Sequence, residues 1–317
     1  MPRSVLIAGL IASAGTAARA QWIVVNLHPA GATASFAYGV SGAEQVGMAF
    51  DKPMVWHGSA DSWAELSSTP GQASGVHNGR QVGSVYPHAY LWSGLGAPVV
   101  DLNPPQAYDA VAYGIHGNDQ VGMVRMFLDS LPQRASLWHG SAETWIDLSP
   151  PGAYYSAAYG TGGGQQVGET QLVGRHASLW IGSAESWIDL HPAGAVSSVA
   201  WGVDNGQQVG SVSYGSGLHA ALWTGTAESV VDLHPPGPSS STALAVHEGE
   251  QVGYTVVAPV SRAALWSGTA ASYVDLHALL PPGFASSQAR AIWHGPGVTY
   301  IVGYGTTVAA PHAEALM

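Results

Sequence analysis

The chain has 317 residues, only 9% of which are charged, and its 20 acidic against 9 basic residues give a formal net charge of −11. Nucleic-acid binding requires a basic stripe, which this composition excludes, and the same shortage of Lys and Arg argues against anionic membrane surfaces. There is no cysteine, so no disulfide framework exists and the fold depends on core packing.

The first twenty residues have the features of a secretory signal peptide. Arg3 gives a positive start, residues 5–12 form a short apolar core, and Ala18-Arg19-Ala20 is a small-x-small cleavage site. We expect cleavage after Ala20 and a mature protein that is secreted, periplasmic or on the cell surface. The apolar core is too short for a membrane span, and no second run of membrane length follows. A buried N-terminal helix is the alternative.

Residues 21–317 repeat one pattern seven times, which predicts a single domain. Six copies contain Gln-Val-Gly and the last has Ile-Val-Gly; their central valines are Val46, Val82, Val121, Val167, Val209, Val252 and Val302. Successive valines lie 36 to 50 residues apart. Repeats of this length, built from strand-like segments, are typical of β-propellers.

Each copy has four short segments, which are clear around position 200. Trp187–Leu190 is aromatic and β-branched, ends in Asp-Leu and precedes a Pro-Gly loop. Ala200–Val203 has small residues at alternate positions, and a Gly-rich turn leads from it into Gln208–Gly210, as in a hairpin. The fourth segment, His219–Trp223, reads His-Ala-x-Leu-Trp. Other copies begin this segment with His88, Arg134, His176, Arg262 and His312.

Four strands in each of seven copies, without helical periodicity, predict an all-β fold: a seven-bladed β-propeller of four-stranded blades. The small-residue segment is expected to be innermost, because Gly and Ala let seven strands crowd around the axis. The last copy ends without an acidic-Leu strand, which residues 22–27 could supply. We therefore expect the N-terminal strand to complete the last blade and remove two exposed edges. An open array of sandwiches or a parallel solenoid is the alternative.

The order of these motifs resembles the HAF-type extracellular repeat family of bacteria. The resemblance rests on Asp-Leu, Ala-x-Gly-Val, Gly-Gln-x-Val-Gly and His-Ala-x-Leu-Trp, and it covers residues 22–316. The family is named for His-Ala-Phe; the nearest copy here is His88-Ala89-Tyr90, so the chain would be a divergent member. The resemblance implies export and a propeller-like fold, and it supplies no activity or catalytic residue.

Three copies end the first segment with Asp-Leu-His. These pairs are Asp189 with His191, Asp232 with His234, and Asp275 with His277. Side chains two apart on a strand share a face, so such a pair could bind a metal ion. Alternatively, the Asp caps the following turn and the His closes it by hydrogen bonding. Asn103 and Ser149 replace the histidine in other copies, which favours the structural role and predicts no metal or cofactor.

Aromatic residues of the small-residue segments are candidates for ligand contact. Trp201 and Trp293 lie in or just beyond these segments, whose equivalents include Tyr38, Tyr113 and Tyr159. Rings near one mouth of a channel can stack on sugars. The alternative is packing beneath the channel rim.

The segment 124–133 is the most apolar insertion between two strands of one copy. It carries Arg125 and Phe127. Loops on a rigid scaffold often carry binding residues, so we predict that this loop contacts a ligand or partner.

Enzyme motifs are missing from the sequence, so an exported, non-catalytic propeller that binds a glycan or a surface protein is the leading hypothesis. An extracellular polysaccharide-acting enzyme is one alternative, and a metal-binding scaffold is another. The enzyme would need carboxylates that converge at one mouth. The candidates are Asp109, Asp119, Glu248 and Glu250.

Overall fold

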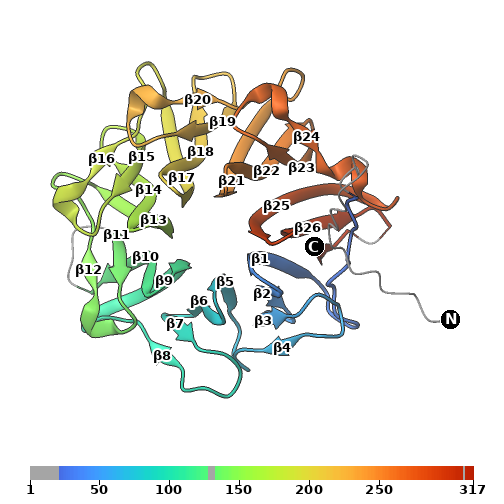
Figure 1. Ribbon diagram of the computed structural model, residues 1–317. Helices are drawn as coiled ribbons and strands as arrows, with labels where there is room; N and C mark the ends of the chain where they lie inside the picture. Colours follow the sequence, from blue (N-terminus) through green and yellow to red (C-terminus); the bar gives the residue numbers. More distant parts are fainter. Residues whose placement is uncertain (1–20, 128–132, 310) are drawn as a thin grey trace.

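The computed structural model describes residues 21–127, 133–309 and 311–317, and in this part of the chain seven antiparallel sheets form a closed ring (Figure 1). The predicted signal peptide, residues 1–20, lies outside the described residues. Blade one is β1 (Ser35–Ser41), β2 (Glu44–Ala49), β3 (Lys52–Trp56) and β4 (Ala64–Glu65). Blade two is β5 (Gln72–His77), β6 (Arg80–Val85), β7 (His88–Trp92) and β8 (Val100–Asp101).

The next three blades repeat this arrangement. Blade three is β9 (Ala107–His116), β10 (Asp119–Met126), β11 (Arg134–Trp138) and β12 (Ile146–Asp147). Blade four is β13 (Tyr155–Gly162), β14 (Gln165–Gln171), β15 (Arg175–Trp180) and β16 (Ile188–Asp189). Blade five is β17 (Ser197–Asp204), β18 (Gln207–Ser213), β19 (Leu218–Trp223) and β20 (Val231–Asp232).

The ring ends with two larger hairpins. Blade six is β21 (Ser240–His247), β22 (Glu250–Val257), β23 (Val260–Trp266) and β24 (Val274–Asp275), and blade seven has β25 (Phe284–Gly295), β26 (Val298–Thr307) and β27 (Ala313–Leu316). Short 3₁₀ turns are η1 (Ala142–Thr144), η2 (Ala184–Ser186), η3 (Ala227–Ser229), η4 (Ala270–Ser272) and η5 (Leu276–Leu279). None of the helices in the described ranges has the length and apolar character needed to cross a membrane. The predicted all-β, seven-bladed propeller and its strand order are confirmed.

The N-terminal segment runs antiparallel to β27 along the outer edge of blade seven. Val25 and Met317 exchange backbone hydrogen bonds of 2.7 and 2.9 Å, and the Leu27 N–H donates to the Ala315 carbonyl at 2.9 Å. Between these hydrogen bonds, Asn26 pairs with Leu316. In Figure 1 the blue start of the described chain accordingly meets the red blade.

The register of this contact corrects one assignment in the last blade. The Leu27–Ala315 hydrogen bond matches the one between Leu190 and Ala177 in blade four, also 2.9 Å. Glu314 therefore takes the place of the strand-start histidine. The prediction that His312 takes this place is wrong by two residues. His312-Ala313 has the sequence of the motif, but it lies two residues before the position that pairs as the motif does in the other blades.

Tryptophans of the Leu-Trp motif fill the wedges between blades. Trp223 of blade five packs against Val167, Leu179 and Leu190 of blade four, and all four side chains are buried. Five of these tryptophans are completely inaccessible: Trp56, Trp138, Trp180, Trp223 and Trp266. Burial of such large apolar surfaces is the main stabilising term in a chain without disulfides.

The Asp-Leu-His turn joins adjacent blades through a short chain of hydrogen bonds. Asp189 Oδ1 accepts the His191 N–H at 2.9 Å, which caps the turn. The Ala177 N–H donates to Ser198 Oγ at 2.9 Å, and Ser198 Oγ lies 2.8 Å from His191 Nδ1. His191 Nε2 lies 3.1 Å from the Ala195 carbonyl. A neutral imidazole must donate to that carbonyl, so Nδ1 accepts from Ser198.

The same histidine–serine pair recurs at other blade junctions. The pairs are His28 with Ser35, His234 with Ser241, and His277 with Ser287, each at 2.8 Å. The Ser149 hydroxyl takes the histidine's place toward Ser156, at 2.9 Å. Both ring nitrogens of His191 are engaged in this role, so these turns act as links between blades, as the structural interpretation predicts.

Candidate functional site

One residue in each innermost strand forms a β-bulge and lines the central channel. In β17, for example, Ala200 pairs with Gly210 and Gly202 with Val209, which leaves Trp201 unpaired. A bulge re-aims the side chain of its extra residue. The bulged residues of the small-residue segments, one from each blade, are Tyr38, Ser74, Tyr113, Tyr159, Trp201, Leu244 and Arg290; β9 and β25 each have a second bulge, at Tyr108 and Ala285. We call the set from the small-residue segments the bulge ring; all its members line a central cavity of about 460 Å³.

Glycine after the bulge lets neighbouring inner strands approach closely. A Cβ on Gly160 would lie 2.8 Å from the Trp201 carbonyl oxygen, and one on Gly202 would lie 2.9 Å from that of Leu244. Real Cβ atoms are not found at such distances, so the small residues of this segment are a steric requirement of the ring.

Three aromatic side chains of the bulge ring form a continuous arc along the channel wall. The ring centroids of Tyr113 and Tyr159 are 5.3 Å apart, and those of Tyr159 and Trp201 are 4.5 Å apart. Elsewhere in the ring, the Arg290 guanidinium lies 5.9 Å from the Tyr38 ring centroid. The channel therefore offers apolar ring faces together with one cationic donor group.

A buried carboxylate holds the middle of the aromatic arc. Glu169 Oε1 accepts a hydrogen bond of 2.8 Å from the Tyr159 hydroxyl, and Glu169 Oε2 accepts one of 2.7 Å from Arg175 Nε. Burial raises the pKa of the Tyr159 hydroxyl above its ordinary value, and the Glu169 charge raises it further. Tyr159 is thus a neutral, fixed donor, and its ring orientation is set by Glu169.

One feature of the sequence could have identified Glu169 as a residue of the site. Glu169 is the one charged residue directly after the repeated Val-Gly pair, where other copies have Met, Ser or Tyr. Ser74, Leu244 and Arg290 are the bulge-ring members not expected from the sequence. Ala291 replaces the usual glycine after Arg290, which hides the motif in the last copy.

The predicted pair Trp201 and Trp293 is separated by the structure. Trp201 belongs to the bulge ring, whereas Trp293 lies three residues beyond Arg290, the bulged residue of its strand. Trp293 packs on Tyr300, with ring centroids 6.0 Å apart, and does not line the described channel cavity. Trp293 therefore does not occupy the position of Tyr113 and Tyr159, and its contact with a ligand stays a prediction.

Arg125 and Phe127 lie at the beginning of the predicted contact loop, whose residues 128–132 fall outside the described part. Arg125 Nε donates to Asp109 Oδ1 at 2.7 Å, and its guanidinium lies 5.4 Å from the Tyr108 ring centroid. Phe127 meets Tyr108 edge-on at 5.3 Å. Phe127 is 65% exposed and Tyr86 of the neighbouring blade is 69% exposed. We call Tyr86, Tyr108, Arg125 and Phe127 the rim cluster.

The carboxylates considered for catalysis are divided between the two ends of the inner hairpins. Asp109 is opposite Arg125 at one end of the β9–β10 hairpin, whereas Asp119 is opposite His116 at the other end. Asp119 Oδ1 lies 2.8 Å from His139 Nδ1. Glu250 is opposite His247, at the turn of the β21–β22 hairpin. This geometry gives no support to a carboxylate pair formed by Asp109 and Asp119.

Among the residues that the structure describes, one group of side chains has the composition of a cation site. Ligand atoms of His28, His312 and Glu314 lie within 4.8 Å of one another. His28 Nδ1 is already bonded to Ser35, and Glu314 accepts hydrogen bonds from Asn26 at 2.6 Å and from His312 at 3.0 Å. The group therefore functions as a hydrogen-bond network at the junction of the two chain ends.

Comparison with known proteins gives the fold and no family. No family model matches the chain, and no curated protein matches it. A mutant of puromycin hydrolase superposes with a TM-score of 0.61 at 10% identity, over 88% of this chain and 53% of that one. A puromycin-hydrolyzing peptidase of Mycobacterium tuberculosis gives 0.58 at 13% identity, over 99% and 56%.

A single propeller domain gives a similar result. The β-propeller domain of the Trilobed protease from Pyrococcus furiosus superposes with a TM-score of 0.56 at 6% identity, over 90% of this chain and 93% of that one. The present chain spans about half the length of the puromycin hydrolase and of the Mycobacterium tuberculosis peptidase. At these identities the likeness concerns the propeller fold alone.

Proposed function

We propose that this chain is an exported, non-catalytic binding propeller whose central channel takes a glycan. The observation that carries the proposal is the aromatic arc of Tyr113, Tyr159 and Trp201 on the channel wall. Sugars present apolar faces that stack on such rings, while their hydroxyls need fixed donors and acceptors. Arg290 supplies hydrogen-bond donors from the same bulge ring.

The charge distribution favours a neutral or weakly charged saccharide. Asp109 is paired with Arg125 and Glu169 with Arg175, so these carboxylates are not available as a bare anionic patch. Export is inferred from the sequence of residues 1–20. Membership of the HAF-type family is likewise a proposal that rests on the motifs.

A glycan array, followed by calorimetry on residues 21–317, tests the channel. Trp201→Ala is expected to weaken the binding of any array hit at least tenfold, because it removes one end of the arc. Trp293→Ala, outside the channel cavity, is the matched control and should bind like the wild type. Absence of binding on the array, or equal loss with both variants, would refute the glycan proposal.

The rim cluster supports a second candidate, a surface protein as ligand. Tyr86, Tyr108 and Phe127 are exposed aromatic residues beside Arg125, and aromatic residues with Arg are enriched in protein interfaces. A partner bound there should be lost with Phe127→Ser and unaffected by Trp201→Ala. The opposite pattern would exclude the rim as the partner site.

A further inference from the structure

Arg290 differs from the other basic side chains in the part of the chain that the structure describes, because no oxygen of the protein accepts its hydrogen bonds. Its one described contact is with the ring of Tyr38. Each of the others donates to an oxygen: Lys52 to Glu65, Arg80 to the Gly117 carbonyl, Arg125 to Asp109, Arg134 to Asp147, Arg175 to Glu169, and Arg262 to Asp275. Acidic residues outnumber basic ones by 20 to 9 in this chain, so a half-buried arginine without a carboxylate is unexpected.

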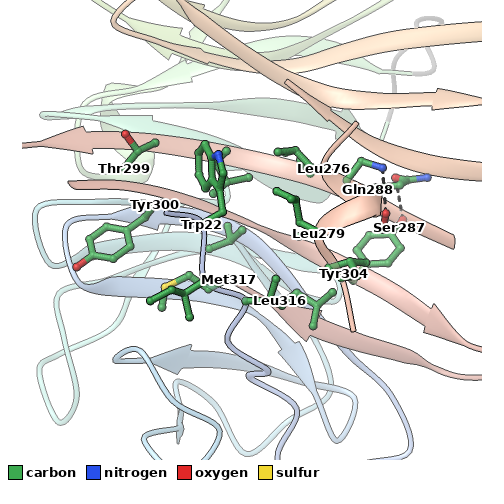
Figure 2. A pocket seen from close by; sticks show the side chains of 18 of the residues that line it. Trp22, Leu276, Leu279, Ser287, Gln288, Thr299, Tyr300, Tyr304, Leu316 and Met317 are labelled. Atoms are coloured by element: carbon green, nitrogen blue, oxygen red, sulfur yellow. Dashed lines mark hydrogen bonds between the residues drawn. The ribbon is translucent and has the colours of Figure 1, made fainter. Parts of the chain in front are cut away.

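The polar side chain two residues before Arg290 is bonded elsewhere. Gln288 Oε1 accepts a hydrogen bond of 2.9 Å from the Tyr304 hydroxyl on the facing strand (Figure 2). The Arg290 guanidinium lies instead 5.9 Å from the Tyr38 ring centroid. A contact with a ring face orients a guanidinium without using its N–H donors. These donors are therefore directed to the channel, where a bound molecule can accept from them.

Arg290 is the only charged side chain among the described residues that line the central cavity. Its neighbours on this wall are uncharged and polar. Tyr38, Gln72 and Ser74 line the same cavity, and Gln72 Nε2 lies 3.4 Å from Ser74 Oγ. These residues belong to β25, β1 and β5, which follow one another around the channel (Figure 1). Blades seven, one and two thus give the channel a polar side with a single positive charge.

The aromatic arc occupies another side of the same cavity. Tyr113, Tyr159 and Trp201 come from the consecutive strands β9, β13 and β17 of blades three to five. A molecule that fills the channel therefore meets apolar ring faces on one side, and hydroxyl, amide and guanidinium groups on the other. The sugar ring of a uronic acid has this division, because its C–H groups form apolar faces while its hydroxyls and its carboxylate lie at the ring edge.

The single guanidinium favours a carboxylate over a phosphate group. The planar fork of an arginine matches the two oxygens of a carboxylate, with which it forms parallel hydrogen bonds. One guanidinium balances one negative charge. The second charge of a phosphate monoester would stay uncompensated in the channel of a chain whose net charge is already −11.

We propose that the central channel selects glycans that contain a uronic acid, and that Arg290 is the residue that determines this specificity. Arg290 binds the sugar carboxylate, Tyr38 and Ser74 bind hydroxyls beside it, and the aromatic arc stacks on an apolar sugar face. This inference rests on the proposed glycan-binding function and adds the ligand class to it. A single bound uronate keeps the ligand among the weakly charged saccharides.

Calorimetry on residues 21–317 with matched pairs of ligands tests the proposal. The probes are oligomers of galacturonate, glucuronate and mannuronate, each compared with its methyl ester, which keeps the sugar hydroxyls and removes the charge. For at least one pair, the acid should bind at least tenfold more tightly than the ester, because esterification removes a charge-assisted hydrogen bond. The preference should decrease as the salt concentration rises.

Variants assign the preference to Arg290. Arg290→Met should abolish the difference between acid and ester and leave the affinity for the ester unchanged, whereas Arg290→Lys should keep part of the difference. Arg80→Met is the matched control, since Arg80 does not line the cavity, and it should keep the full preference. Trp201→Ala should weaken acid and ester alike. Unfolding temperatures show whether each variant is folded, and the comparison of acid with ester in the wild type needs no variant.

The outcomes separate this inference from the proposed function. Equal affinity for acid and ester, with both lost in Trp201→Ala, would overturn the role of Arg290 and leave the glycan proposal standing. Absence of binding by every glycan would refute both. A preference for the acid that persists in Arg290→Met, or tighter binding of a sulfated or phosphorylated oligosaccharide than of any uronate, would also overturn the inference.

Discussion

Asn26 Nδ2 donates a hydrogen bond of 2.6 Å to Glu314 Oε2, which joins residues 288 positions apart in the sequence. The corresponding pair in blade four is Asp189 with His176 at 2.8 Å. The carboxylate lies on the outermost strand in blade four and on the third strand in blade seven. At the junction of the two chain ends, the hydrogen-bond donor and the carboxylate acceptor have therefore exchanged strands relative to blade four.

This exchange predicts that Asn26→Asp destabilises the ring. The substitution would place two carboxylates at hydrogen-bond distance and remove the donor to Glu314, at an expected cost of about 1–3 kcal/mol. Urea unfolding at pH 7.5 measures the change. The double variant Asn26→Asp with Glu314→His recreates the blade-four pair and should recover most of the loss. Equal stability of the single variant and the wild type would mean that this hydrogen bond does not hold the ends together.

The number and order of strands could be predicted because each copy repeats the same chemistry. Small residues indicate the strand nearest the axis, where Gly160 and Gly202 lie close to neighbouring backbones. Large apolar residues indicate the strands that pack between adjacent blades. The register of the last blade could not be predicted. His312-Ala313 has the same letters as the true motif, and only the backbone pairing of Leu27 with Ala315 identifies Glu314 as the equivalent.

The residues of the candidate site could be predicted only in those copies whose small-residue segment keeps its glycine. Tyr113, Tyr159 and Trp201 precede a glycine in the small-residue segment, whereas Arg290 precedes Ala291. Whether a side chain points into the channel depends on the bulge, which is a property of strand pairing and not of composition. Trp293 is aromatic and close in sequence, yet it lies past the bulge.

Trp223→Ala is expected to lower the free energy of unfolding by about 3–5 kcal/mol, because it empties a packed wedge. The resulting void would be lined by apolar side chains, and apolar cavities of this kind bind small aromatic molecules, so indole should restore part of the lost stability. Trp63→Ala, at a site that is 38% exposed, is the control and should cost far less and show no additional rescue. Thermal unfolding with and without indole measures both effects. Failure of indole to raise the variant's stability above its effect on the wild type would contradict this account of the wedges.

Stability should fall as the pH drops below about 6.5, the ordinary pKa of histidine. Burial lowers the pKa of His191, and so does the neighbouring His176; burial also lowers the pKa values of His234 and His277. A lowered folded-state pKa means that the unfolded chain binds more protons, so stability is present above pH 6.5 and is lost as the pH falls through the folded-state values. Unfolding temperatures between pH 8 and pH 5 reveal this slope.

Serine is the matched replacement at these positions, since Ser149 fills the role in blade three. The variant with His191→Ser, His234→Ser and His277→Ser should have a shallower acid slope than the wild type. His57→Ser, at an exposed position, should leave the slope unchanged. If the triple variant lost stability with falling pH as steeply as the wild type, groups other than these three histidines would cause the acid sensitivity.

Arg175→Ala should destabilise the protein more than Glu169→Gln, although both remove the same ion pair. The Glu169 side chain is 4% exposed and that of Arg175 is 46% exposed. Loss of Arg175 leaves a charge buried, at an expected cost of about 2 kcal/mol or more. Loss of the Glu169 charge leaves an arginine that can turn to solvent, while the new amide oxygen still accepts from Tyr159. Adding Glu169→Gln to Arg175→Ala should therefore recover stability, as measured by urea unfolding. A larger loss of stability with Glu169→Gln than with Arg175→Ala would contradict this prediction. It would mean that the negative charge of Glu169, and not its role as a hydrogen-bond acceptor, stabilises the aromatic arc.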